Sequence, residues 1–264
     1  MKFLGKGSVG KENHLVELIA IENMAKSFGG LRAVDGVTVE LKERELVSVI
    51  GPNGAGKTTL FNLITGFIKP DRGKVFFKGE DITHLPVQKM VRKGIARSFQ
   101  LLNVFSELTV FENIRMGIQA HMGFGFQFLT SLDSLTEVRE KVPAIVESVG
   151  LHDKENVRAK DLSYGDNKIL DVAIALTSNP EVILLDEPTS GLAMRETGRM
   201  LDLIGKLSER LTILLVEHDM NVVFALSKRI IVMDQGKIIA EGLPDDIRKD
   251  ERVQEAYFGG EWSC

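Results

Sequence analysis

Cysteine is almost absent from this sequence. The only one among 264 residues is Cys264, so a single chain cannot form an internal disulfide. That usage fits a reducing compartment. Long apolar runs are missing as well, since none approaches the roughly 18 residues that cross a bilayer. No apolar stretch follows the first residues, so we expect neither a secretory signal nor a spanning helix. Any membrane role would then come through a partner.

An excess of basic charge is also absent. The sequence holds 33 Lys and Arg against 37 Asp and Glu, which gives a net charge of −4. It therefore creates no strong field for nucleic acid and leaves only a local basic patch as a possible binding surface. With 44% hydrophobic and 27% charged residues, the composition is that of an ordinary soluble protein long enough to bury its own core. The length allows one large domain or two small ones.

The stretch with the clearest chemistry is 51–58, Gly-Pro-Asn-Gly-Ala-Gly-Lys-Thr, between an apolar run at 46–50 and a helix-like run at 59–64. Strand, glycine-rich turn and helix in this order suit a phosphate-binding loop, because small residues let backbone N–H groups surround an anion at a helix N-terminus. Lys57 can reach the β- and γ-phosphates, and the Thr58 hydroxyl can ligate Mg²⁺. The residues expected to bind the nucleotide here are Pro52, Asn53, Gly54, Ala55, Gly56, Lys57, Thr58 and Thr59.

Polar residues follow two later apolar runs. One run ends in Asp186 and Glu187, and another is followed by His218. Such runs, separated by helical stretches, are typical of buried parallel strands, and ligands bind at the carboxyl ends of those strands. Asp186 is placed to hold Mg²⁺ through water, and Glu187 to polarise a water for attack on the γ-phosphorus. Taken alone, the acidic pair would more simply be a solvated strand end, but the upstream loop favours the chemical interpretation.

The remaining pattern predicts an α/β protein. Runs at 18–22, 37–41 and 75–77 are typical of strands in an antiparallel patch, and residues from about Pro86 to Gly150 are mostly helical in character. We therefore expect an α/β core with an antiparallel β subdomain and an inserted helical subdomain, and with the phosphate loop this core resembles that of the P-loop NTPases (RecA-like).

A further motif, Leu162–Asp166, precedes a helical run that extends to Leu176. Ser163 is suited to cap the N-terminus of this helix, and Asp166 falls in its first turn. On its own the motif predicts a well-capped helix and nothing more.

In their order along the chain, these motifs resemble those of the ABC transporter ATPases over nearly all of residues 17–242. Six motifs in one order are far more specific than any one of them. The runs 94–100 and 107–113, together with Tyr164, narrow the resemblance to the Liv-type branch. These are the ATPases of bacterial branched-chain amino acid importers, and the chain looks most like their G-type subunit. The six motifs are the loop 51–58, Gln100 in Arg-Ser-Phe-Gln, the signature Leu162–Asp166, the run 182–187, Ser190-Gly191-Leu192, and His218.

The resemblance implies a role for each position. Phe28 stacks on adenine, and because stacking reads a flat ring, little discrimination against GTP is expected. Gln100 senses Mg²⁺ and the γ-phosphate, and His218 contacts the γ-phosphate and holds the attacking water with Glu187. The alternatives without a role at the nucleotide are a core aromatic for Phe28, a surface amide for Gln100 and a structural role for His218. The expected catalytic residues are Glu187, His218, Gln100 and Lys57, and the expected metal ligands are Thr58, Gln100 and Asp186.

The resemblance also implies that Ser163 and Gly165 bind the γ-phosphate of an ATP held by another subunit. A helix N-terminus with a hydroxyl and a bare backbone suits an anion. A monomer then holds only half of each site. The expected working form is a head-to-tail dimer with a second ABC ATPase, either the same chain or a paralogue, which ATP closes and hydrolysis opens.

The implied organisation is a flexible leader at 1–16, an ABC ATPase domain at 17–242 with the helical subdomain at about 90–160, and a C-terminal tail at 243–264. Transmembrane permease subunits would dock short coupling helices around 100–135, a solute-binding protein would act indirectly, and the chain would lie peripherally at the cytoplasmic face of the membrane. Apolar residues in this stretch fit either core packing or a partner-facing patch. They are Met116, Met122, Phe124, Phe126, Phe128 and Leu129.

The predicted function is therefore the ATP-binding and ATP-hydrolysing subunit of an ABC importer for branched-chain amino acids, although related ATPases serve urea, other amino acids or lipids. One alternative is a soluble ABC ATPase acting on nucleic acid or ribosomes. Such proteins usually have tandem cassettes or long insertions, whereas this chain has one cassette and about 60 residues between Gln100 and the signature. Another alternative is a regulatory subunit with a weak nucleotide site.

Three positions depart from the usual family pattern. Asp166 stands where Gln or Glu is common, Ala193 where Asp or Asn helps to link the two sites of the dimer, and Ile174 where a basic residue is usual. None of these changes removes a residue expected to bind or cleave ATP. They bear on how strongly the two sites are coupled.

Overall fold

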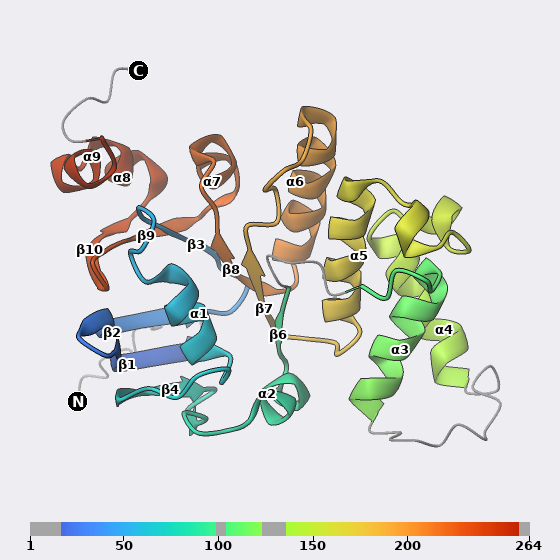
Figure 1. The fold of residues 1–264 in the computed structure, drawn as a ribbon, viewed down its shortest axis with the longest axis horizontal. Helices are drawn as coiled ribbons and strands as arrows, with labels where there is room; N and C mark the ends of the chain where they lie inside the picture. Colours follow the sequence, from blue (N-terminus) through green and yellow to red (C-terminus); the bar gives the residue numbers. More distant parts are fainter. Residues whose placement is uncertain (1–16, 99–103, 123–135, 259–264) are drawn as a thin grey trace, which may run out of the picture.

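Two β-sheets of different build, with helix α1 between them, form the centre of the computed structural model, which describes residues 17–98, 104–122 and 136–258 (Figure 1). Gln100 lies outside the described residues, as do Phe124, Phe126, Phe128 and Leu129 of the apolar stretch. The roles assigned to them stay predictions.

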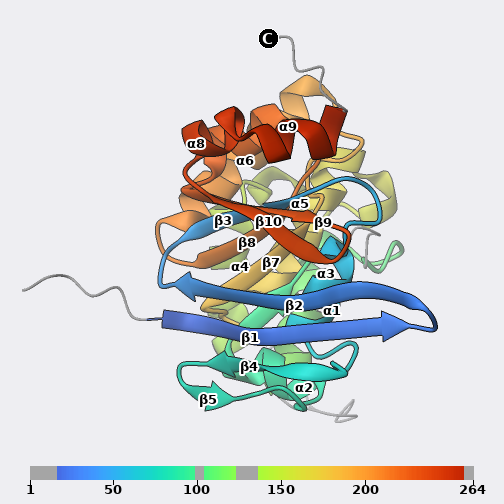
Figure 2. The same ribbon diagram turned by 90° about the vertical axis from the view of Figure 1, so that its left-hand side faces the viewer.

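The smaller sheet is antiparallel, with its strands in the order β2-β1-β4-β5 (Figure 2). A tight turn at Gly29-Gly30 joins the first two strands and pairs Phe28 with Leu31. This is the antiparallel β subdomain that the sequence predicts. Its strands are β1 (Glu17–Phe28), β2 (Leu31–Lys42), β4 (Arg72–Phe77) and β5 (Glu80–Asp81).

The larger sheet has the order β10-β9-β3-β8-β7-β6 and is parallel except for β10, which runs antiparallel to β9. Its edge strand, β6, falls within the segment that the sequence pattern made mostly helical, and the sequence analysis did not single it out. Three residues are too few to show a strand period. The strands are β3 (Leu46–Ile50), β6 (Ile95–Arg97), β7 (Val182–Asp186), β8 (Thr212–Val216), β9 (Arg229–Asp234) and β10 (Lys237–Gly242).

Alternate residues of the central strands enter two different cores. Val182 and Leu184 of β7 pack with α1 and the antiparallel sheet, whereas Ile183 and Leu185 pack with the helices on the other face. Both faces are therefore apolar, as a covered parallel sheet requires. Helices α3, α4 and α5 lie together at the right of Figure 1. The helices of this part are α1 (Lys57–Ile64), α2 (Val87–Lys93), α3 (Val110–Met122), α4 (Thr136–Ser148), α5 (Tyr164–Leu176) and α6 (Met194–Ser208).

The C-terminal part packs behind the start of the phosphate loop. A third apolar cluster includes Ile50, the last residue of β3, and Val253 of α9, with Tyr257 against its margin. The described part of the tail, as far as Phe258, is thus docked on the same body that carries the site. None of the helices in the described segments combines the length and apolar character needed to cross a bilayer. The helices of this part are α7 (Met220–Leu226), α8 (Pro244–Lys249) and α9 (Glu251–Phe258).

Candidate active site

The loop between β3 and α1 is folded tightly at its base and open at its tip. Gly56 has a φ of 101°, and a Cβ built there would lie 2.1 Å from the carbonyl oxygen of Ala33. Only glycine fits such a position. A Cβ built on Gly54, by contrast, would have no heavy atom within 4 Å. The loop therefore leaves room for a ligand at Gly54 while its base is fixed against β2.

Lys57, the first residue of α1, is buried in this loop. Its Nζ donates hydrogen bonds to the carbonyl oxygens of Gly51 (2.6 Å) and Pro52 (2.9 Å). Burial lowers the pKa of Lys57, and the carboxylates of Glu187 and Asp186 oppose that shift. The ammonium group is thus held inside the loop, where phosphate oxygens can replace the two carbonyls as its partners.

A cavity of about 300 Å³ brings together residues that are far apart in the sequence. It is lined by Phe28 and Leu31 of the β1–β2 turn, loop residues 53–59, Glu187 after β7 and His218 after β8. Half of the Phe28 surface is exposed (50%), which does not fit a core aromatic. One hollow therefore offers an exposed ring, a phosphate-binding loop and an acid–imidazole pair.

Glu187 and His218 form that pair at the carboxyl ends of neighbouring strands. Glu187 Oε1 lies 2.5 Å from His218 Nε2. Glu187 also has a φ of 50°, a left-handed backbone that is uncommon outside glycine and clusters at functional sites. A carboxylate and an imidazole in contact at the cavity wall can orient a water molecule and accept its proton.

Glu217 is a member of this site that the sequence analysis did not single out. Its Oε1 accepts hydrogen bonds from the Thr189 N–H (2.9 Å) and hydroxyl (2.7 Å), and its Oε2 accepts one from the His218 N–H (3.2 Å). Burial raises the pKa of Glu217, and the Thr189 bonds oppose that shift. The buried carboxyl ties the loop after Glu187 to the backbone of His218, which holds the pair in place. Its position beside His218 was the only signal in the sequence.

Asp186 ends β7 and is 1% exposed. Its Oδ2 accepts a hydrogen bond from Arg97 Nη2 (2.7 Å), and Arg97 Nη1 donates to Asn62 Oδ1 of α1 (2.5 Å). Asp186 Oδ1 is buried and has no hydrogen-bond partner among the described residues. Such an atom fits a cation ligand, so that Asp186 and the exposed Thr58 hydroxyl suit Mg²⁺. Sequence analysis missed Arg97 as the partner of Asp186.

Ser163 and Gly165 do not line this cavity. They lie at the N-terminus of helix α5. Ser163 caps this helix, since its Oγ accepts a hydrogen bond from the Asp166 N–H (3.1 Å). Asp166 is 2% exposed and forms ion pairs with Lys154 (2.5 Å) and with Arg199 of α6 (2.8 Å). The departure from Gln or Glu at this position thus carries a buried carboxylate that fixes α5 to α6.

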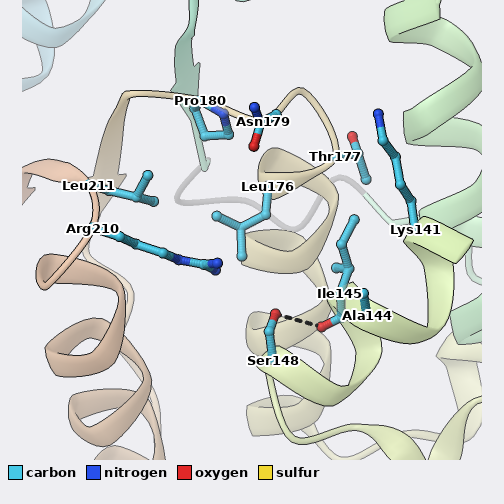
Figure 3. A pocket seen from close by; sticks show the side chains of 10 residues that line it. All are labelled: Lys141, Ala144, Ile145, Ser148, Leu176, Thr177, Asn179, Pro180, Arg210 and Leu211. Atoms are coloured by element: carbon cyan, nitrogen blue, oxygen red, sulfur yellow. Dashed lines mark hydrogen bonds between the residues drawn. The ribbon is translucent and has the colours of Figure 1, made fainter.

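Two further hollows of about 340 Å³ each lie elsewhere. One is a groove between α2, α3 and the end of α5, with Ile174 in its lining. The other opens at the amino ends of β7 and β8, where Arg210 extends toward Leu176 and Leu211 lies next to Arg210 (Figure 3). Neither holds a residue predicted to bind nucleotide, and ligands of parallel sheets bind at the opposite, carboxyl ends of the strands.

A parallel sheet with a glycine-rich loop, a following helix, and acidic residues at the end of a neighbouring strand defines a P-loop nucleoside triphosphatase. The model of the ABC transporter family matches residues 34–190, and one for the branched-chain amino acid ATP-binding cassette transporter matches residues 237–263. The chain belongs to the ABC transporter family and is an ATPase. The predicted fold class and the resemblance to this family are confirmed.

Relatives with similar sequences cover the chain almost completely. The high-affinity branched-chain amino acid transport ATP-binding protein LivG of Salmonella typhimurium is 40% identical over 92% of this chain and 98% of its own length. LivG of Escherichia coli K12 and BraF of Pseudomonas aeruginosa are each 39% identical with the same coverage.

Solved structures agree with the sequence relatives. A nucleotide-free ATP-binding cassette from an ABC transporter superimposes with a TM-score of 0.82 at 32% identity, covering 92% of this chain and 99% of the other. A dimeric cassette in a post-hydrolysis state with ADP and Pi has a TM-score of 0.72 at 26% identity, covering 86% and 99%.

Proposed function

We propose that this chain is the ATP-hydrolysing subunit of an importer for branched-chain amino acids. The observation that carries the proposal is the single cavity in which Phe28, the phosphate loop and the Glu187–His218 pair meet. LivG and BraF are by name branched-chain amino acid transport proteins, and this supports that substrate over urea, other amino acids or lipids.

In the proposed reaction, the Glu187 carboxylate accepts a proton from a water molecule that it holds together with His218. That water attacks the γ-phosphorus in line with the bond to ADP, which breaks to give ADP and inorganic phosphate. Lys57 and the loop N–H groups stabilise the charge that develops on the phosphate oxygens. Thr58 and Asp186 would hold Mg²⁺, which when bound supplies neutralisation of the phosphate charge.

A second cassette completes each site in this proposal. Ser163 and Gly165 of one subunit bind the γ-phosphate of the ATP on the facing phosphate loop. Large side chains are exposed on both halves, with Phe28 (50%) at the cavity and Tyr164 (47%) and Met194 (92%) beside the signature. Such exposure suits an intermittent interface. The dimeric relative with ADP and Pi supports pairing of this kind.

The groove between α2, α3 and α5 is the proposed docking place for a permease coupling helix. Its lining includes Ile174, where the family usually has a basic residue, and Met116 on the neighbouring turn of α3 is 37% exposed. Gln100 follows β6 and Ser98 in sequence and keeps its proposed role of relaying the state of the γ-phosphate to this region. The chain would then lie peripherally at the cytoplasmic face of the membrane, with the solute-binding protein acting indirectly.

The first test replaces Glu187 with Gln, which cannot accept the proton. We expect ATP binding to persist and turnover to fall by about 100-fold or more. Glu43→Gln, an exposed acid in the turn after β2, is the matched control and should leave turnover unchanged. Undiminished hydrolysis by the Glu187→Gln chain would contradict the proposed reaction.

Purification of the wild-type chain from solubilised membranes tests the transport role. We expect membrane permease subunits to co-purify. Nucleic acid in their place would favour the soluble ABC ATPase. An isolated wild-type dimer without turnover would favour a regulatory subunit.

A further inference from the structure

An anionic side chain already lies against the N-terminus of helix α5. It is the carboxylate of Glu196, a residue in the first turn of α6. Glu196 Oε1 lies 3.0 Å from Ser163 Oγ and 3.2 Å from the Gly165 nitrogen. Both are donors to the same carboxylate oxygen. They are also the two groups that the proposed function assigns to the γ-phosphate of the facing subunit's ATP.

The fit of this carboxylate depends on the glycine of the signature. A Cβ built on Gly165 would lie 2.6 Å from both Cδ and Oε1 of Glu196. A bare backbone is therefore needed at 165 for an anion to reach the N–H group. The N-terminal end of α5, a helix of 13 residues, adds its positive dipole to the two donors.

Of the two carboxylates beside Ser163, Glu196 is the one that can move away, because Asp166 is held by two ion pairs. The Ser163 hydroxyl has one proton and two carboxylate neighbours, Glu196 Oε1 and Asp166 Oδ2, each at 3.0 Å. Asp166 is buried and tied to Lys154 and Arg199, so it cannot move without breaking both ion pairs. Glu196 is only half-buried, and apart from Ser163 and Gly165 its hydrogen bond is to the Ala193 N–H (3.3 Å). The Ser163 hydrogen bond holds the pKa of Glu196 below its ordinary value.

We propose that Glu196 sets the ATP concentration at which the dimer closes: in the open subunit its carboxylate occupies the place that the γ-phosphate of the facing ATP takes on closure. This inference rests on the proposed function of Ser163 and Gly165. A carboxylate and a phosphate cannot share the two donors, because like charges at contact distance repel. The γ-phosphate brings more charge and more oxygens and can displace Glu196. ADP has no group that reaches the signature, so Glu196 stays and the dimer stays open.

The test follows dimer formation by full-length chains as ATP or ADP is titrated, using sedimentation or light scattering. The background is Glu187→Gln, which prevents turnover. Glu196→Gln keeps the shape and the bond to the Ala193 N–H but removes the charge. We expect Glu196→Gln to lower the ATP concentration for half-closure by about 10-fold, because the charge-assisted hydrogen bonds from Ser163 and Gly165 to residue 196 are weakened. ADP, which brings no γ-phosphate to the two donors, should still not close the dimer.

A merely structural role for Glu196 in capping α6 gives the opposite result. Glu196→Gln would then leave the ATP concentration for half-closure unchanged or raise it, and either outcome would overturn the inference. Asp202→Asn removes the same charge from an exposed position of α6 and should leave the ATP concentration for half-closure unchanged. Thermal unfolding of the nucleotide-free Glu196→Gln chain should show no stabilisation, so tighter closure cannot come from a more stable fold.

A second variant distinguishes failure of this inference from failure of the proposed function. Ser163→Ala, in the same background, should abolish ATP-driven closure. If it does and Glu196→Gln changes nothing, only the inference fails. If Ser163→Ala closes as readily as the parent chain, the signature does not bind the γ-phosphate and the proposed function itself fails.

Discussion

The N-termini of α1 and α5 present two anion sites of the same general kind, yet the first is open and the second is filled. At α1 the loop tip at Gly54 faces open space, and within the described segments Lys57 donates its hydrogen bonds to carbonyl oxygens of its own loop. At α5 the Ser163 hydroxyl and the Gly165 N–H already donate to Glu196. A nucleotide can therefore bind at α1 without displacing Glu196. In the proposed dimer, binding of its γ-phosphate at α5 requires that Glu196 be displaced.

For the proposed dimer, the difference gives an expected order of events. The phosphate loop of one subunit takes up ATP first, because that half-site is built before the ligand arrives. Closure onto the signature of the facing subunit comes second and has to release Glu196. Binding and closure are therefore separate steps with separate residues, and variants that affect one step should leave the other intact.

The largest effect should come from removing the charge of the open site. Lys57→Ala deletes the ammonium group that faces the phosphates, and the loss of charge-assisted hydrogen bonds is expected to weaken ATP binding by about 100-fold. Fluorescence titration with an ATP analogue measures it. Lys69→Ala, at an exposed position after α1, is the control and should bind as the parent does. Unchanged ATP affinity in the Lys57→Ala chain would show that the loop before α1 is not the site that binds the phosphates first.

Much of the open half-site could be predicted because its residues stand next to strand ends. The loop after β3, Glu187 after β7 and His218 after β8 meet in one cavity because parallel neighbouring strands end at one edge of the sheet. The sequence shows apolar runs with polar residues after them, and the pairing of parallel strands brings those polar residues together. The antiparallel subdomain was predictable for a similar reason, since its runs alternate in polarity.

The partners of these residues could not be predicted in the same way. Arg97 meets Asp186 across 89 positions, and Glu196 meets Ser163 across 33. Neither has a local pattern that points to its partner, because the contact depends on how two elements pack. Strand β6 was missed because three residues have too little period to distinguish strand from helix. Local signals thus locate the groups that bind ligand, while the groups that hold them are set by tertiary packing.

A smaller effect is expected from loosening the filled site. Asp166→Asn removes the carboxylate that joins Lys154 and Arg199, and should lower the free energy of unfolding by about 2 kcal/mol at pH 7. This is less than for fully buried pairs, because both cations are partly solvated. Burial tends to raise the pKa of Asp166, but the bonds from Lys154 and Arg199 outweigh it and the pKa is lowered.

The sign of that shift gives a pH dependence. A carboxylate with a lowered pKa stabilises the fold above its unfolded pKa, and the stabilisation is lost as the pH falls through its folded pKa. The difference between the parent and Asp166→Asn should therefore shrink below about pH 4. Urea unfolding at several pH values measures it. Asp153→Asn, whose side chain is 73% exposed, is the control and should differ little from the parent. A difference that persists at low pH would mean that packing, and not charge, accounts for the loss.

The smallest effect should come from the wall of the open site. Phe28→Leu removes the ring but keeps an apolar side chain at a half-exposed position, so the fold should be unaffected. Loss of base stacking, worth about 1 kcal/mol or somewhat more, should weaken binding by about fivefold to tenfold. Because a ring stacks on any purine, ATP and GTP should weaken alike, and Phe28→Tyr should bind both as the parent does. Phe105→Leu, at another exposed aromatic outside the cavity, is the control. A loss confined to ATP would show that the β1–β2 turn reads the base edge, and the open half-site would then select its nucleotide before closure.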